Sequence, residues 1–174
     1  MKFLVDANIL SEPTKAAPDP KVVDWLRQHE ADIAVDPFIL GEIRFGILLL
    51  SKGKRRTRLE RWFDEGIQRL HCLPWEAEAG MRWAELLASL RASGRAMPIK
   101  DSLIAATALV HGLTVATRNR TDFEKASASS GWVDRAETAV AASREDTGDT
   151  EPMYFFFRFE PPFLRVLVVE RLRP

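Results

Sequence analysis

The chain has few of the residues and patterns that mark several whole classes of protein. Only one cysteine, Cys72, occurs in 174 residues, so no intramolecular disulfide can form. Its place beside an apolar run predicts a small core residue rather than a nucleophile. The three histidines, His29, His71 and His111, lack the spacing of a zinc site, and a glycine-rich phosphate loop is absent. The sequence therefore contains neither a zinc-site motif nor a glycine-rich nucleotide-binding motif.

Long apolar runs and a net charge are also missing. No run approaches the roughly 18 apolar residues of a membrane helix. The first apolar run, residues 3–5, is interrupted by Asp6, which does not fit a signal peptide. We therefore expect a cytoplasmic protein without membrane contact. The 25 basic and 25 acidic residues balance, and only the basic stretch 52–61 stands out, either as a solvated helix face or as a phosphate-binding surface.

Short apolar runs alternate with helical patterns along the first part of the chain. Asp19-Pro20 and Asp36-Pro37 both place an N-cap residue before a proline, which marks the start of a helix. Strands are predicted at 3–5, 33–35, near 72–73 and at 113–116, with helices from 20, from 37 towards 53, over 59–70, over 76–93 and over 102–111. This order predicts an α/β protein, a three-layer sandwich with a short central parallel sheet flanked by helices.

The last part of the chain has a different character. Residues 127–151 are rich in Ala, Ser, Thr and Asp and have weak periodicity. Two β-prone segments follow, 153–157 and 164–169, separated by a turn at Pro161-Pro162. We expect a first domain over 1–126 and an atypical C-terminal extension over 127–174, to which the sequence assigns no role.

Acidic and amide side chains stand where apolar runs end or helices begin. Asp6 follows the first strand, Asn119 and Asp122 follow the last strand of the first domain, and Glu42 and Asp101 lie near helix starts. Carboxylates beside apolar segments are costly unless they are paired or bind a cation. Ligands of open α/β sheets bind beyond the carboxyl ends of the strands, so these side chains are predicted to share one metal site.

Each of these residues also has a purely structural interpretation. Asp6 would cap a turn through Asn8, Glu42 would pair with Arg44 or Lys52, Asp101 would cap the helix 102–111, and Asp122 would cap the turn after it. Ser11 and Thr117 either bond to a carboxylate or phosphate or hold turns. Trp62, Trp75 and Trp83 lie beside helical stripes and are interpreted as core or dimer contacts.

Four segments in the same order resemble the PIN-domain family, in particular the VapC-like toxins of bacterial toxin–antitoxin pairs. They are residues 4–11 (LVDANILS), 40–47 (LGEIRFGI), 99–108 (IKDSLIAATA) and 115–123 (VATRNRTDF). The likeness runs from Met1 to about Lys125. Beyond it the extension departs from the family, whose members usually end soon after the fourth segment.

The resemblance implies a Mg²⁺- or Mn²⁺-dependent endoribonuclease that acts as a toxin, forms a homodimer and is inhibited by a cognate antitoxin. The catalytic residues carried over are Asp6, Glu42, Asp101 and Asp122, and the metal ligands are Asp6, Glu42, Asp101 and Asn119. Asn119 stands at a position that is Asp in some relatives, and the choice between Asn119 and Asp122 as fourth residue stays open.

Other functions remain compatible with the same residues. A phosphatase or a structure-specific DNA nuclease would use the same carboxylates. A non-cleaving PIN-like module that binds RNA or a partner is the alternative outside enzymes. For the antitoxin we predict an apolar groove near Ile43, Ile47, Leu48 and Trp62.

Overall fold

A central sheet organises the computed structural model, which describes residues 1–119, Phe123, 155–157 and 165–168. Its strands are β1 (Phe3–Val5), β2 (Ile33–Val35), β3 (His71–Cys72), β4 (Thr114–Thr117), β5 (Phe155–Phe157) and β6 (Arg165–Val168). They lie in the order β3-β2-β1-β4-β6-β5, and each pair is parallel except β5 with β6. The predicted parallel sheet is confirmed.

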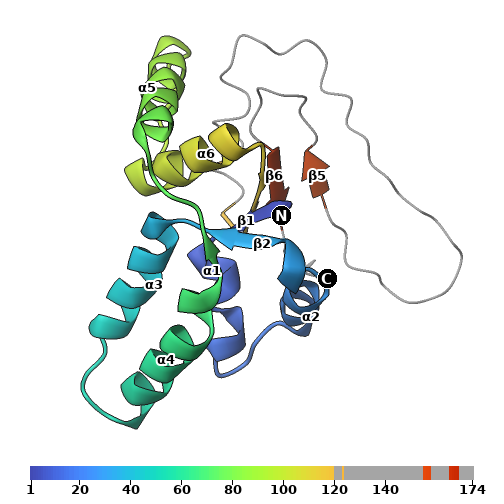
Figure 1. The fold of residues 1–174 in the computed structure, drawn as a ribbon, viewed down its shortest axis with the longest axis vertical. Helices are drawn as coiled ribbons and strands as arrows, with labels where there is room; N and C mark the ends of the chain where they lie inside the picture. Colours follow the sequence, from blue (N-terminus) through green and yellow to red (C-terminus); the bar gives the residue numbers. More distant parts are fainter. Residues whose placement is uncertain (120–122, 124–154, 158–164, 169–174) are drawn as a thin grey trace, which may run out of the picture.

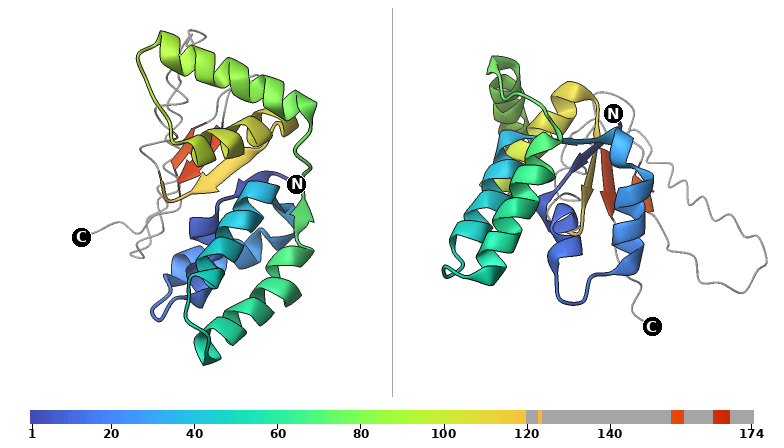
Figure 2. Two further views of the ribbon diagram at one scale, coloured as in Figure 1. Left: turned by 90° about the vertical axis from the view of Figure 1, so that its left-hand side faces the viewer. Right: turned by 60° about the horizontal axis from the view of Figure 1, so that its bottom comes forward.

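Helices cover the sheet on both faces, as the α/β prediction requires (Figures 1 and 2). The α-helices are α1 (Ala7–Leu10), α2 (Pro20–Gln28), α3 (Pro37–Leu48), α4 (Lys54–Glu65), α5 (Ala77–Ala92) and α6 (Ile99–His111). Single 3-10 turns occupy Glu12–Thr14, Glu30–Asp32 and Ile67–Arg69. In both figures α5 packs against α6 at an angle and α3 packs along α4, so these four helices form two pairs.

The helix starts follow from local chemistry. The side chain of Asp19 accepts a hydrogen bond from the backbone N–H of Lys21, and that of Asp36 accepts one from Ile39, so both are N-caps as predicted. Proline stands at the first position of both helices, where its missing N–H costs nothing. At the other end of α6, Gly112 has φ 62°, the left-handed conformation that glycine adopts without strain.

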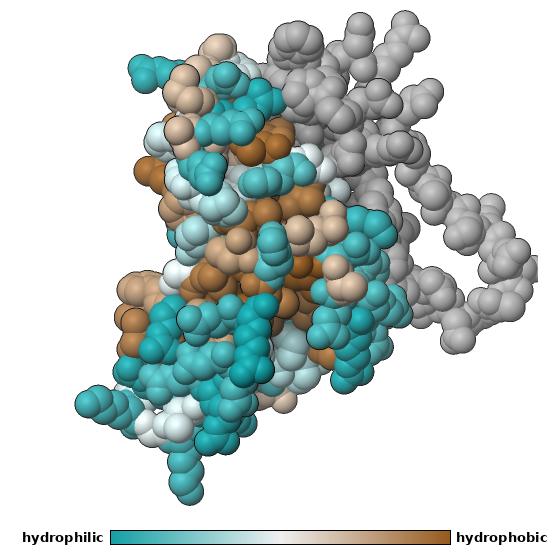
Figure 3. Space-filling model, in the orientation of Figure 1, coloured by the Kyte–Doolittle hydropathy of each residue, from teal (hydrophilic) through white to brown (hydrophobic). Residues whose placement is uncertain are grey.

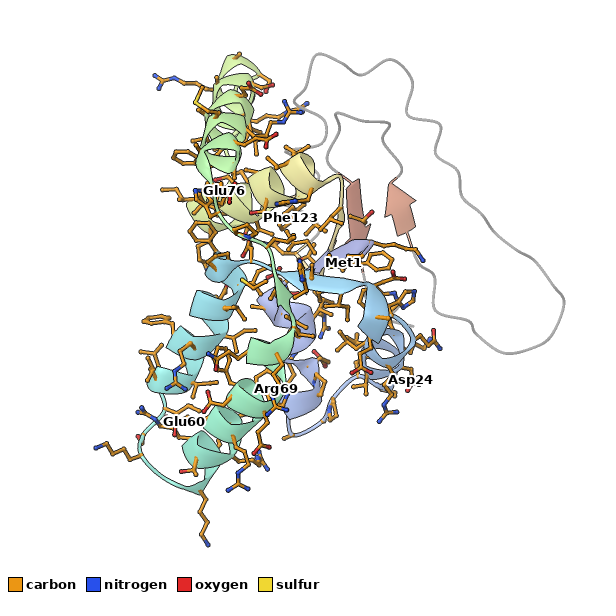
Figure 4. The ribbon with its side chains drawn as sticks, viewed as in Figure 1. Met1, Asp24, Glu60, Arg69, Glu76 and Phe123 are labelled. Atoms are coloured by element: carbon orange, nitrogen blue, oxygen red, sulfur yellow. The ribbon has the colours of Figure 1, made fainter. Side chains whose placement is uncertain are left out.

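The core lies between the sheet and its helices. All three residues of β1 and all three of β2 are buried, which is expected of parallel strands covered on both faces. Trp25 of α2 packs edge-on against Phe3 with ring centroids 5.1 Å apart. Phe123, labelled in Figure 4, is fully buried in the same core.

Three expectations from the sequence need correction. Helix α6 begins at Ile99, with Pro98 as its N-cap, so Asp101 lies inside the first turn and is not the cap. Glu42 is in the middle of α3 rather than near its start. Cys72 is exposed, not a core residue, because β3 is the edge strand of the sheet. Partial burial is the largest cause that raises the pKa of the Cys72 thiol, and the negative charge of Asp36 raises it further. A raised pKa leaves less thiolate, so Cys72 is a weak nucleophile.

Both β-prone segments of the C-terminal part form strands, as predicted. Strand β6 lies parallel to β4, with Thr117 opposite Val168, and β5 pairs antiparallel with β6. The segments thus extend the sheet of the first 119 residues. The boundary at 126/127 stays a prediction, and residues 127–151 lie outside the described part.

One surface of α3 is apolar. Phe45, Leu48 and Leu49 are among the exposed large hydrophobic residues, while Ile43 and Ile47 are buried in the core. The prediction of an apolar groove near Ile43, Ile47, Leu48 and Trp62 is therefore wrong in part, because Ile43 and Ile47 are not at the surface. Figure 3 shows apolar surface at the end of this helix and teal, hydrophilic surface beside it.

Within the described residues, no helix is both long and apolar enough to cross a membrane.

Candidate functional site

Asp6 stands at the carboxyl end of β1, where the sheet opens. Its backbone N–H donates to the carbonyl of Ala116 in β4, which continues the ladder by one residue. Its carboxylate is buried, and Oδ2 accepts two hydrogen bonds of 2.6 Å, from the Thr117 hydroxyl and from Asn8 Nδ2. From the sequence, Asp6 was a candidate to hold a turn through Asn8, and Thr117 a candidate to bond to a carboxylate. Both contacts occur, and both are made to Oδ2 of Asp6.

The environment of Asp6 disfavours its negative charge. Burial is the largest cause that raises the pKa of this carboxyl, and the negative charge of Glu42 raises it further. The hydrogen bond from Thr117 and the nearby N–H groups of Ala7 and Asn8 act in the opposite direction. A buried carboxylate that faces a second acid is the arrangement that a bound cation stabilises.

A chain of hydrogen bonds links Asp6 to Asp101. Thr117 Oγ1, which donates to Asp6, accepts a hydrogen bond of 3.0 Å from the backbone N–H of Asn119. Asn119 Nδ2 in turn donates to Asp101 Oδ2 at 3.0 Å. Three of the predicted site positions, one just after β1, one in the first turn of α6 and one just after β4, are thus brought together.

Glu42 reaches the same place from α3. Its Oε1 is 2.7 Å from Nζ of Lys100, which precedes Asp101 in α6. The structural alternative raised from the sequence, a pairing of Glu42 with Arg44 or Lys52, is replaced by the pair with Lys100, and Arg44 lies over the Phe63 ring. The pKa of Lys100 is raised, first by its hydrogen bond to Glu42; burial opposes this, and the charges of Glu42, Asp101 and Asp6 raise the pKa further. All three acids therefore act on one ammonium group.

A buried ion pair supports the loop after β4. Glu12 is 2% exposed, and its Oε2 accepts from Arg118 at 2.7 Å and from Lys15, while Oε1 accepts from the N–H of Asp19. The backbone N–H of Arg118 also donates to Asn8 Oδ1 at 3.1 Å. Arg118 thus fixes the segment that carries Thr117 and Asn119 against the turn that carries Asp6.

The donors at this place fit a hard divalent cation. Carboxylate and amide oxygens are what Mg²⁺ and Mn²⁺ bind, and Mg²⁺ commonly uses one or two carboxylates and keeps several waters. Among the described residues, no three acidic, histidine or cysteine side chains are positioned to share an ion. Two of these acids are bonded to other side chains instead: Lys100 donates to Glu42 and Asn119 donates to Asp101.

The structure does not describe every predicted site residue. Asp122 lies outside the described residues, so its role stays a prediction. Ser11 caps the end of α1 through its backbone and holds the turn, which was one of its two interpretations. Sequence reasoning missed Lys100, Glu12 and Arg118 as parts of the site. The only sequence signal for Lys100 was its position directly before Asp101. No sequence pattern indicated that Glu12 and Arg118 would form a pair.

The chain is similar to known proteins in sequence and in fold. The family model of the PIN domain matches residues 3–128. The "VapC ribonuclease Y4jK" of Sinorhizobium fredii is 35% identical over 128 residues, which cover 71% of this chain and 91% of the relative.

The "Toxin FitB" of Neisseria gonorrhoeae is 32% identical over 125 residues, 70% of this chain and 90% of the relative. The crystal structure of FitAcB from that organism has a TM-score of 0.67 and 32% identity, and covers 71% of this chain and 92% of its own. A structure from the VapBC family of toxin–antitoxin systems, VapBC-5 of Mycobacterium tuberculosis, has a TM-score of 0.53 and 27% identity over 71% and 90% of the two chains. On the sequence segments, the sheet order and these matches, this chain belongs to the PIN-domain family.

Proposed function

We propose that the chain is a metal-dependent endoribonuclease that hydrolyses RNA phosphodiester bonds and acts as the toxin of a toxin–antitoxin pair. The observation that carries the proposal is the hydrogen-bonded chain from Asp6 through Thr117 and Asn119 to Asp101, with Glu42 beside it. The choice of RNA is supported by the name of the ribonuclease relative, and the toxin role by the names of the toxin relatives.

Asp6 and Asp101 are the proposed direct ligands of Mg²⁺ or Mn²⁺. Both have short side chains on rigid elements, the end of a buried strand and the first turn of a helix. Glu42 has a longer side chain and orients the attacking water or completes the ligand set, and Asn119 or Asp122 closes the rim. When bound, the ion lowers the pKa of a coordinated water and neutralises charge on the attacking and leaving oxygens.

The surrounding residues keep the ligands in place. Because Thr117 and Asn8 both bond to Oδ2 of Asp6, the orientation of the carboxyl plane is fixed before any ligand arrives. Thr107 and Asp36 join α6 to α3 below the site through a buried hydrogen bond. The protein thus fixes the orientation of the Asp6 carboxylate, and orienting ligands is the contribution expected of a protein in metal-ion catalysis.

The experiment is cleavage of total cellular RNA by the purified full chain, with Mg²⁺ or Mn²⁺ and with EDTA. The expected result is cleavage that needs the metal and falls to the EDTA level in Asp6→Asn and in Asp101→Asn. Asp24→Asn, an exposed aspartate of α2, is the matched control and should cleave as wild type does. Unchanged cleavage by folded Asp101→Asn would reject the site assignment.

The same assay separates the other functions. Flapped DNA, single-stranded DNA and a phosphomonoester, tested beside RNA, report a DNA nuclease or a phosphatase. Absence of both cleavage and Mn²⁺ binding would support the non-cleaving module, for which the Asn at position 119 and the Lys100–Glu42 pair are the relevant features.

The partners we propose are a cognate antitoxin and a second copy of the chain. The exposed apolar residues Phe45 and Leu48 of α3, with Leu49 directly after the helix, are the surface we assign to protein contacts. Expression in a bacterial host should arrest growth, and Asp6→Asn should remove the arrest. Light scattering on the purified chain tests the dimer, which Leu49→Asp should weaken if α3 forms its interface.

A further inference from the structure

Lys100 brings a positive charge to the acids of the proposed ligand set. Its Nζ lies 2.7 Å from Oε1 of Glu42, so the pair crosses from α6 to α3. The side chain of Lys100 is 61% exposed and that of Glu42 is 34% exposed. An ion pair this open to solvent is weak and exchanges readily with other ions.

Lys100 is charged and close to the proposed ligands. Lysine is an ammonium near neutral pH without any special environment, and Lys100 contacts Glu42 through Nζ. It also directly precedes Asp101 in the first turn of α6. Nζ is therefore the counter-charge of the acidic group in this structure.

A divalent cation and the Lys100 ammonium compete for the same carboxylate. Both are attracted to Glu42, and a cation bound by Asp6, Glu42 and Asp101 would repel the ammonium. The long flexible stem of lysine lets Nζ leave Glu42 without moving α6. A lysine released beside a metal site is well placed for a phosphate oxygen, because lysine binds phosphate as a mobile point charge.

We propose that Lys100 holds Glu42 in the metal-free protein and, when a divalent cation takes that carboxylate, binds a phosphate oxygen of the RNA substrate. This inference rests on the proposed function and adds a substrate-binding residue to it. Lys100 remains protonated in both positions, so no proton is transferred.

The chain provides a matched control. Lys2 forms an ion pair of 2.9 Å with Asp32, and its side chain is 71% exposed, so the pair resembles that of Lys100 in length and exposure. Lys2 lies before β1, at the opposite end of this strand from Asp6. Lys2→Met thus removes a comparable pair away from the site.

The test measures Mn²⁺ binding by calorimetry and RNA cleavage at saturating Mn²⁺ for wild type, Lys100→Met, Lys100→Arg and Lys2→Met. In Lys100→Met the Kd for Mn²⁺ should fall about two- to fivefold, the effect of losing an exposed ionic competitor. Its kcat/KM should also fall, by about ten- to a hundredfold, as expected for a lost charged hydrogen bond to substrate. Lys100→Arg should keep most of the kcat/KM.

Tighter metal binding together with weaker cleavage is a result that a merely structural ion pair does not produce. A Kd for Mn²⁺ in Lys100→Met that equals or exceeds that of Lys2→Met would overturn the inference, and so would an unchanged kcat/KM. Both outcomes leave the proposed function standing if wild type binds Mn²⁺ and cleaves RNA. Wild type that does neither overturns the proposed function and this inference with it.

Discussion

The Thr107 hydroxyl donates a hydrogen bond of 2.9 Å to Oδ2 of Asp36, and both side chains are fully buried. Asp36 is the N-cap of α3, the helix of Glu42, and Thr107 belongs to α6, the helix of Asp101. The contact therefore fixes the two helices that bring acids to the site. It joins residues 71 positions apart, so it reports on the tertiary fold rather than on local structure.

Asp36→Asn is expected to change how stability depends on pH. Burial is the largest cause that raises the pKa of Asp36 above 3.8, the charge of Asp6 adds to it, and the bonds from Ile39 and Thr107 oppose it. A carboxyl whose pKa is raised on folding contributes most stability below its unfolded pKa, and this contribution is lost as pH rises through the folded pKa. Asparagine does not titrate.

Melting temperatures of wild type and Asp36→Asn, measured from pH 4 to pH 7.5, check this. The difference should move in favour of Asn as pH rises, by about 2–4 °C for each kcal/mol gained. Asp24→Asn, which replaces an exposed aspartate, is the control and should change little. Parallel curves for wild type and Asp36→Asn would contradict the prediction.

Thr117→Val should weaken both the fold and the metal site. The Thr117 hydroxyl donates to Asp6 and accepts from Asn8 Nδ2 and from the N–H of Asn119, and the residue is fully buried. Valine leaves these groups without that partner, at an expected cost of about 1–3 kcal/mol in the free energy of unfolding. Thr117→Ser keeps the hydroxyl and is the control.

The measurements are urea unfolding and Mn²⁺ calorimetry on the two variants. Valine should raise the Kd for Mn²⁺ about ten- to a hundredfold, the range found when residues behind a metal ligand are removed. If Thr117→Val and Thr117→Ser bound Mn²⁺ equally well, Thr117 would have no part in holding Asp6 for the ion.

Much of the fold was predictable because its signals are local. Asp36-Pro37 predicts a capped helix, and residues 3–5 predict a buried strand, and both are confirmed. The error at α6 has a local cause as well. Pro98 takes the cap position, so the helix starts three residues early and Asp101 becomes part of its first turn.

The contacts of the site were less predictable because they depend on the register of the sheet. Strand β1 lies beside β4 with Val5 opposite Ala116, and this register places Asp6 next to Thr117, 111 residues away. The sequence was enough to select each acidic residue as a candidate for the site. Their partners, Lys100 for Glu42 among them, follow only from the packed helices.

Arg118→Met tests the ion pair behind the site. Burial acts to raise the pKa of Glu12, but Lys15, the N–H of Asp19 and Arg118 together lower it below 4.5. A lowered pKa contributes stability above the unfolded value, and this stability is lost as pH falls through the folded value. The variant should therefore lose about 1–3 kcal/mol at pH 7, and less below pH 4.5.

Unfolding free energies of wild type, Arg118→Met and Arg118→Lys at pH 7 and pH 4 measure this. Arg118→Lys keeps the charge and should retain part of the stability. A loss in Arg118→Met that is equally large at both pH values would show that packing of the arginine stem, rather than its charge, stabilises the loop.

Asn119→Asp should make the site depend on metal for its stability. Asn119 Nδ2 now donates to Oδ2 of Asp101 at 3.0 Å, and a second carboxylate there would replace attraction by repulsion. Without metal the variant should melt below wild type. With Mn²⁺ the added oxygen ligand should give it the larger rise in melting temperature, because ligand binding to the folded state stabilises that state.

Thermal unfolding in EDTA and in Mn²⁺, with Asn119→Ala beside it, distinguishes the contributions. Alanine removes the hydrogen bond without adding charge, so it should lose stability in EDTA and gain no more from Mn²⁺ than wild type does. An Asn119→Asp protein whose metal response matched that of Asn119→Ala would place position 119 outside the ligand set. In that case Asp122 would be the remaining candidate for the fourth site residue.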